Sequence, residues 1–135
     1  MATANPSFKV VEFQTRGKGL ITEDTIFPGT IIGTYLSKDL EPITEGRILY
    51  DGWIESIPIG RYVNHSRTPN SNVSLEGNNI YLISNNVIDY RDEITVNYLE
   101  VAELINLPKS EYSKYGIEDF NYTPQINVSR KPTLF

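Results

Sequence analysis

The residues from Asn64 to Asn70, NHSRTPN, contain the only histidine of the chain, together with two asparagines, two hydroxyl side chains and a proline. Such a segment could provide a metal ligand, a catalytic base, a glycan acceptor or an ordinary polar turn. A metal site at His65 is disfavoured, because the chain has no second histidine and no cysteine, which leaves only carboxylates as further ligands. A serine hydrolase is disfavoured too, since Ser66 adjoins His65 and lacks the flanking glycines of a nucleophile elbow.

Four triplets fit the pattern for N-glycosylation, and they begin at Asn64, Asn72, Asn121 and Asn127. Glycosylation would imply a secreted protein. The N-terminus, MATANPSFKV, has neither the basic start nor the apolar stretch of a secretory signal, and no cysteine is available for disulfides. A secreted glycoprotein is therefore the least favoured interpretation, and we expect a soluble intracellular protein.

Two other places could contribute to a site. The segment Gly17-Lys18-Gly19 most simply indicates a tight backbone bend, although the missing side chains would also let backbone groups approach a ligand. It lacks the third glycine and the helix of a dinucleotide-binding fingerprint. Tyr98 is one of nine tyrosines, most of which should pack in or around the core. It differs by its position at the end of an expected strand, where functional residues are common.

The elements that must position these residues are mostly short strands. Alternating apolar residues predict strands over residues 8–13, from Leu20 onward, and over 30–36, 73–75, 80–83 and 94–98. A turn is expected over 15–19 and a hairpin turn over 76–79. Residues 37–46 should be a loop, and 47–59 are ambiguous, with Trp53 and Ile54 buried. Residues 99–107 have apolar side chains at helical spacing and are followed by a proline, which predicts a short helix. The 135 residues therefore predict one mainly β domain with short helices.

The balance of acidic and basic residues favours some classes of binding partner over others. The net charge is −5, from 17 acidic and 12 basic residues. An acidic chain is a poor match for nucleic acid, whose phosphates require lysine and arginine, and a better match for a lysine- or arginine-rich peptide. No apolar run approaches the length of about 18 residues that a membrane helix needs. We expect neither direct nucleic-acid binding nor membrane association.

Taken in order, these segments resemble the SET-domain family of S-adenosylmethionine-dependent protein lysine methyltransferases. The family pattern R-F-x-N-H-S-x-x-P-N is met by residues 61–70, RYVNHSRTPN, and the pattern I-x-x-G-E-E-L-T-x-x-Y by residues 88–98, IDYRDEITVNY. An earlier G-x-G turn and strand are met by Gly17 to Gly19 and, further on, by Gly29 and Tyr35. The resemblance extends from residue 8 to residue 98.

The resemblance implies a SET-domain β-fold, in which small sheets surround a knot-like C-terminal segment. It divides the chain into an N-terminal tail (1–7), a SET core (8–98) and a C-terminal helix with an aromatic-rich segment (99–135) that completes a lid. The pattern is not complete: Arg67 replaces a common cysteine, Arg91 replaces a turn glycine, and Gly33 and Thr34 depart from the strand pattern. No zinc-binding cysteines follow the core, so the lid would come from a homodimer or from C-terminal aromatics, which could equally be simple packing residues: Tyr112, Tyr115, Phe120 and Tyr122.

The resemblance also implies roles for single residues. S-adenosylmethionine would bind on one face, without a metal, and leave as S-adenosylhomocysteine. Its expected contacts are Gly17, Lys18, Gly19, Tyr62, Asn64 and His65. The substrate lysine would enter from the opposite face through a channel lined by the catalytic residues Tyr35 and Tyr98.

The chemistry suits these residue types. Methyl transfer from a sulfonium is an in-line displacement, to which positioning contributes much of the rate. The lysine must react as a neutral amine although its ordinary pKa is near 10.4. An apolar channel and the sulfonium charge both disfavour the ammonium, so no strong base is expected. The sequence therefore predicts a protein-lysine N-methyltransferase of chromatin that acts on histone tails, in the nucleus, or on another basic protein. The alternative is a weak or inactive SET-like module that binds a peptide or a partner protein.

Overall fold

The computed structural model describes residues 6–14, 17–42 and 44–117. The strands of this part are β1 (Phe8–Phe13), β2 (Gly17–Thr22), β3 (Ile31–Ser37), β4 (Gly46–Tyr50), β5 (Trp53–Ser56), β6 (Asn64–His65), β7 (Ser71–Glu76), β8 (Asn79–Ser84) and β9 (Thr95–Val96). The helices are α1 (Ile59–Tyr62), α2 (Tyr98–Leu104) and the 3-10 helix η1 (Lys109–Tyr115). The expected class, mainly β with short helices, is confirmed.

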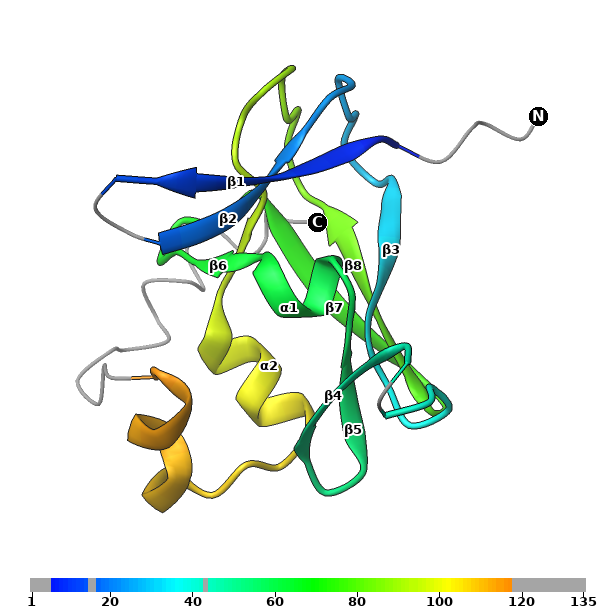
Figure 1. Cartoon of the computed structure of the whole chain (residues 1–135), viewed down its shortest axis with the longest axis vertical. Coiled ribbons are helices and arrows are strands. Elements are labelled where there is room, and N and C mark those ends of the chain that lie inside the picture. Colours follow the sequence, from blue (N-terminus) through cyan, green and yellow to red (C-terminus); the bar gives the residue numbers. More distant parts are fainter. Residues whose placement is uncertain (1–5, 15–16, 43, 118–135) are drawn as a thin grey trace.

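The strands form three sheets. An antiparallel pair, β1–β2, lies at one end of the molecule, and α2 and η1 lie at the other (Figure 1). A five-stranded antiparallel sheet has the order β4-β5-β3-β8-β7 and contains the predicted hairpin as β7 and β8. The third sheet is the short parallel pair β6–β9. The core is built from aliphatic side chains of the sheets together with those of α2, including Leu20, Leu36, Ile80, Leu82, Ile94, Val96 and Val101.

The central strand β3 departs from regular pairing where the sequence departs from the family pattern. Its register with β8 shifts between Ile31 and Gly33 and again between Thr34 and Leu36. A Cβ on Gly33 would lie 2.5 Å from Cδ1 of Ile59, the first residue of α1. The glycine therefore lets α1 pack directly against β3, close to Tyr35.

The predicted turn through Gly19 is wrong in its extent. Gly17, Lys18 and Gly19 all belong to β2, where they pair with Phe13, Glu12 and Val11 of β1. The bend is at Gly17, whose φ of 79° suits a residue without a side chain. The hydrogen bonds between strands are made by backbone groups alone. A glycine-rich segment can therefore form a strand when a neighbouring strand such as β1 pairs with it.

The predicted strand over 94–98 is wrong at its C-terminal end. It is reduced to Thr95–Val96, and Tyr98 is the first residue of α2. The side chain of Asn97 accepts a hydrogen bond from the backbone nitrogen of Leu99 at 2.9 Å, which caps the helix and starts it there. The position of Tyr98 is therefore set by the capped N-terminus of α2.

Arg91 occupies the position at which the resembled pattern has glycine, and it keeps the backbone conformation of a glycine. Its φ is 72°. A left-handed conformation costs a residue with a side chain roughly 1 kcal/mol. The Arg91 nitrogen donates to the Thr22 carbonyl at 2.8 Å, which joins this turn to the end of β2. The turn is thus preserved despite the substitution.

Candidate functional site

The NHS segment and Tyr98, far apart in sequence, are adjacent in the structure. In the parallel pair of β6 and β9, Asn64 lies opposite Thr95 and His65 opposite Val96. The backbone nitrogen of Tyr98 donates to Nδ1 of His65 at 3.0 Å, and the centres of the two rings are 5.1 Å apart. Because Nδ1 accepts this bond, His65 helps to fix the start of α2.

Asn64 joins the NHS segment to the glycine-rich strand. Its Nδ2 donates to the Lys18 carbonyl at 2.9 Å and to Oε2 of Glu93 at 2.8 Å. A Cβ on Gly19 would lie 2.6 Å from Oε2 of Glu93 and 2.9 Å from Nδ2 of Asn64, so only glycine permits this approach. We refer to Gly17–Gly19, Asn64, His65 and Glu93 as the cradle. The structure thus brings together five predicted cofactor residues.

Glu93 was not predicted as a site residue, although the sequence contained a signal for it. It matches one of the two acidic residues in the family pattern over 88–98. Its contact with Asn64 makes it the carboxylate of the cradle. Tyr62, the remaining predicted cofactor residue, is on α1 with the Arg61 guanidinium 5.4 Å from its ring centre. Its contribution to cofactor binding stays a prediction.

The acceptor groups of the cradle suit a ligand that carries an ammonium group. Both hydrogen bonds of the Asn64 amide are made through Nδ2, and its carbonyl oxygen accepts none within the described residues. The Glu93 carboxylate, also an acceptor, is beside it. An amino-acid moiety offers the matching N–H donors. The residues present therefore fit the methionine part of S-adenosylmethionine.

A cavity of about 270 Å³ lies beyond the cradle, among β4, β5, α1 and the C-terminal helices. Its wall includes Tyr35, Leu49, Glu55, Tyr98 and Tyr115. No residue of the cradle lines it. The cradle and the cavity are therefore separate spaces, and Tyr98 contributes to both, through its backbone nitrogen on one side and its side chain on the other.

The two predicted channel tyrosines both line this cavity and are both held in the protonated form. Burial, helped by the neighbouring Tyr98 and the Glu55 carboxylate, raises the pKa of Tyr35 well above its ordinary value. Burial also raises the pKa of Tyr98, with smaller contributions from Glu55 and Glu93. The Tyr98 hydroxyl donates to the Val63 carbonyl at 3.2 Å, whereas the Tyr35 hydroxyl has no hydrogen bond within the described residues. Both side chains can therefore act as hydrogen-bonding hydroxyls and not as phenolate bases.

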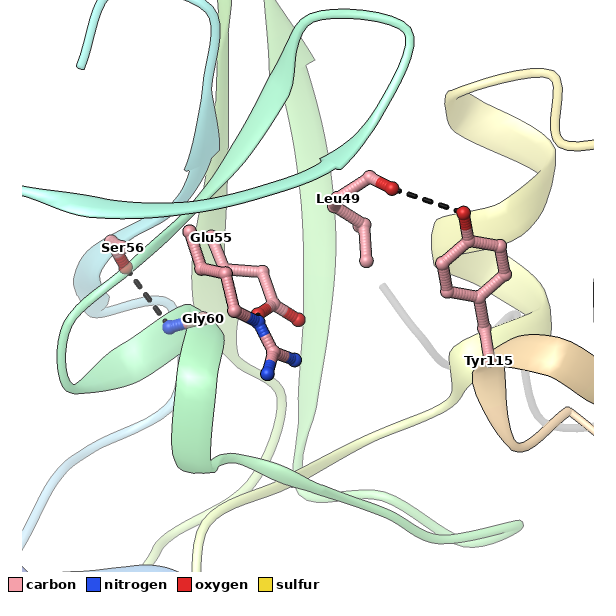
Figure 2. A network of polar contacts seen from close by, with 6 residues as sticks. Leu49, Glu55, Ser56, Gly60 and Tyr115 are labelled. Carbon is pink, nitrogen blue, oxygen red and sulfur yellow. Dashed lines mark hydrogen bonds and ion pairs between the residues drawn. The ribbon is translucent and has the colours of Figure 1, made fainter. Parts of the chain in front are cut away.

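The C-terminal aromatics divide between the two interpretations left open by the sequence. Tyr115 lines the cavity, and its hydroxyl donates to the Leu49 carbonyl of β4 at 3.0 Å (Figure 2). Tyr112 is 7% exposed and packs in the core. Phe120 and Tyr122 lie outside the described residues. Tyr115 thus forms part of the cavity wall, whereas Tyr112 is a packing residue.

Two of the four candidate glycan acceptors are engaged in the fold. Asn64 makes the two bonds described above, and Nδ2 of Asn72 lies 3.3 Å from both carboxylate oxygens of Glu100, while Oδ1 of Asn72 accepts from Asn85 at 2.8 Å. A sugar on either amide nitrogen would displace these contacts. The candidates at Asn121 and Asn127 lie outside the described residues. The site therefore does not favour a glycoprotein.

Residues 6–14, 17–42 and 44–117 lack two further features. No helix of these segments is both long and apolar enough to cross a membrane. They also contain no group of three or more histidine, aspartate or glutamate side chains that could hold a metal ion.

Comparison with known proteins agrees with the resemblance seen in the sequence. The sequence pattern of one family, described as the SET domain, matches residues 17–99. A crystal structure from Plasmodium falciparum, named as a putative histone methyltransferase, is similar at a TM-score of 0.51 and 18% identity, covering 68% of this chain and 96% of the other. No curated protein sequence matches.

Two structures of Polycomb Repressive Complex 2 are similar as well. The apo complex with mutations in Ezh2 has a TM-score of 0.53 and 19% identity. A humanized mutant of the Chaetomium thermophilum complex bound to an inhibitor has a TM-score of 0.52 and 20% identity. Each covers 70% of this chain, which spans only 15% of the other. Likeness at this level of identity concerns the fold.

Proposed function

Since the chain belongs to the SET-domain family, we propose that it is a protein lysine methyltransferase that uses S-adenosylmethionine. The observation that carries this proposal is the position of Tyr98 between two separate spaces. Its backbone nitrogen bonds His65 of the cradle, and its side chain lines the cavity that also contains Tyr35. A methyl group passing from one ligand to another requires such an arrangement, with two binding spaces that meet at one point.

The cradle would bind the cofactor. When bound, S-adenosylmethionine supplies an electrophilic methyl group on its sulfonium. The Asn64 carbonyl oxygen and the Glu93 carboxylate are placed to accept hydrogen bonds from its ammonium group. Gly19 keeps β2 close to both side chains, so that backbone groups of residues 17–19 can follow the ligand.

The cavity would bind the substrate lysine. A long aliphatic side chain with a terminal amine matches a wall that combines apolar residues with the hydroxyls of Tyr35 and Tyr98. The Tyr98 hydroxyl is fixed by its bond to the Val63 carbonyl, so its oxygen lone pairs have a defined direction. It can accept an N–H of the neutral amine and direct the nitrogen lone pair toward the cradle. Burial of the amine disfavours its charged form.

A histone tail, or another lysine-rich protein, is the substrate class we propose. The chain carries a net charge of −5, which favours a basic partner. The assignment of the similar P. falciparum structure as a histone methyltransferase supports the same class. With a histone as substrate, the protein would act in the nucleus.

Methyl incorporation tests the proposal. Purified protein with labelled S-adenosylmethionine should label one or more members of a panel of histones and basic peptides. Tyr98→Phe should reduce turnover by at least about 100-fold, because it removes an electrostatic group at the reacting centre. The same variant should keep its cofactor dissociation constant within about 2-fold, because the bond to His65 is made by the backbone.

Isothermal titration provides the independent control. If the unmodified protein binds no S-adenosylmethionine, the methyltransferase proposal fails. If it binds cofactor and basic peptides but labels none of them, the inactive SET-like module that binds a peptide becomes the better description.

A further inference from the structure

Glu55, in the last half of β5, is a carboxylate enclosed in the wall of the cavity. Its side chain is 14% exposed, whereas that of Arg47, its partner across the β4–β5 hairpin, is 57% exposed. The two are joined by one bond, from Nε of Arg47 to Oε1 of Glu55, at 3.1 Å. The other oxygen of Glu55 has no hydrogen bond within the described residues. In Figure 2 the Glu55 side chain lies between the Ser56–Gly60 bond and the Leu49–Tyr115 bond.

The other charged groups of the cavity wall are at its exposed rim. They are Arg47 on β4, Arg61 on α1 and Lys114 on η1. All three are exposed residues, and Lys114 is paired with Glu111 at 3.2 Å. Tyr35 and Tyr98 are the titratable groups on β3 and α2. Glu55 is thus the least exposed charged group of this wall, and the rim cations are largely screened by solvent.

Two polar groups of the cavity wall have unused hydrogen-bonding capacity. An ionised carboxylate only accepts hydrogen bonds, and the Glu55 oxygen and the Tyr35 hydroxyl both lack a partner within the described residues. A partly buried carboxylate loses hydration, and a cation with several N–H donors can offset that loss. A lysine ammonium is such a cation, and its aliphatic stem can pack on apolar residues of the wall such as Leu49, Val101 and Ile105.

We propose that Glu55 receives the ammonium group of the substrate lysine as it enters the cavity, and that Arg47 occupies this position until the substrate displaces it. This inference rests on the proposed function, since it names the group that selects lysine for the reaction. Glu55 would act before methyl transfer, while the amine is still charged.

The Arg47–Glu55 pair has the features of a displaceable contact. Arg47 uses a single Nε–H and not the two-pronged geometry in which arginine binds carboxylates most tightly. Its side chain is mostly in solvent, where an ion pair contributes little. Burial raises the pKa of Glu55, and this effect outweighs the opposing influence of Arg47 and Arg61. Arg47 therefore compensates the buried charge only in part.

Binding of a small amine can test this inference without any catalytic turnover. n-Butylamine is a cation at neutral pH and resembles the end of a lysine side chain, whereas 1-butanol is a neutral molecule of similar size. NMR titration should show tighter binding of n-butylamine to the unmodified protein. Glu55→Gln should weaken n-butylamine binding by at least about 5-fold and remove the preference over 1-butanol. Arg47→Gln should strengthen n-butylamine binding, because the competing cation is gone.

The steady-state kinetics of methylation of a basic protein should change in the same directions as n-butylamine binding. The KM should rise in Glu55→Gln and fall in Arg47→Gln, with kcat at saturating substrate changed less than about 3-fold and the cofactor dissociation constant unchanged. A merely structural ion pair would instead make both variants fail alike. Equal weakening by the two substitutions, or an unchanged affinity in Glu55→Gln, would therefore overturn the inference.

Unfolding measurements keep a folding defect apart from a binding defect. The folded state raises the pKa of Glu55, so it binds the carboxyl proton more tightly than the unfolded chain does. Stability linked to this group is therefore lost as pH rises through the acid range, and Glu55→Gln should be at least as stable as the unmodified protein at neutral pH. Glu55-dependent amine binding without any methyl incorporation would contradict the proposed function and leave the cation site standing.

Discussion

At the scale of single residues, the cradle depends on how closely β2 approaches Asn64 and Glu93. Lys18 takes part through its carbonyl, to which Asn64 donates, while its side chain is exposed. Gly19 takes part through the absence of a side chain. Neither residue thus contributes a side chain to the cradle. Substitution of Gly19 and substitution of Lys18 should therefore differ sharply in their effect on cofactor binding.

We expect Gly19→Ala to weaken S-adenosylmethionine binding by at least about 10-fold, which corresponds to roughly 1.4 kcal/mol. The added Cβ would lie 2.7 Å from Cε2 of Phe13 and closer still to the Glu93 carboxylate, so the cradle must open. Lys18→Ala is the matched control and should change the dissociation constant by less than about 2-fold. Calorimetry checks both, and equal effects would show that the cradle does not bind the cofactor as proposed.

At the scale of elements, the cavity exists because a short helix packs tightly against two strands. Ser56 accepts from the Gly60 nitrogen at 2.9 Å and donates to the Thr34 carbonyl at 2.6 Å, which joins α1, β5 and β3 (Figure 2). A Cβ on Gly60 would collide with the Tyr35 carbonyl and come within 3.1 Å of the Glu55 Cα. Gly60 therefore determines the spacing of the elements that carry Tyr35 and Glu55.

Gly60→Ala should destabilise the fold by about 1–3 kcal/mol, because its added methyl group meets backbone atoms that cannot move independently. Gly33→Ala is the matched control, since its methyl group would meet the flexible end of the Ile59 side chain. A smaller loss is expected there. Urea denaturation of both variants gives the comparison, and a greater loss in Gly33→Ala would refute this account of the packing.

At the scale of the whole molecule, the acidic balance bears on the approach of the substrate. Long-range attraction between a chain of net charge −5 and a lysine-rich tail accelerates their encounter. It has little effect on the chemistry within the cavity, where local contacts dominate. A homodimer, as a way to complete the lid, stays a prediction.

The association rate with a lysine-rich substrate should therefore fall several-fold when the ionic strength increases from about 0.05 M to about 0.5 M, because the Debye length shortens to a few ångströms. Stopped-flow measurement checks this. A peptide that keeps one lysine but has glutamine in place of the other basic residues should respond much less. Identical salt dependence of the two peptides would exclude steering by the overall charge.

Local patterns in the sequence were sufficient for the fold class, whereas the candidate site came from the resemblance of its motifs to a family. The alternation of apolar residues predicted β1, β3 and the β7–β8 hairpin, because side chains that alternate between core and solvent are a local property of a strand. The resemblance to the SET-domain family implied that the segments around Asn64 and Tyr98 lie together, and the β6–β9 pairing and the Tyr98–His65 hydrogen bond show that they do. The ends of elements were harder to predict, since the Asn97 cap and the pairing of Gly17–Gly19 with β1 outweighed local preference.

The tertiary structure alone decided which charged groups belong to the site. Glu55 and Glu93 are ordinary acidic residues in the sequence, and only folding encloses one in the cavity wall and brings the other to Asn64. It likewise separated Tyr115, which lines the cavity, from Tyr112, which packs in the core. The reason is physical: residue type and spacing report local conformation, whereas the burial of a charge and the partner of a hydrogen bond depend on strands that are distant in sequence.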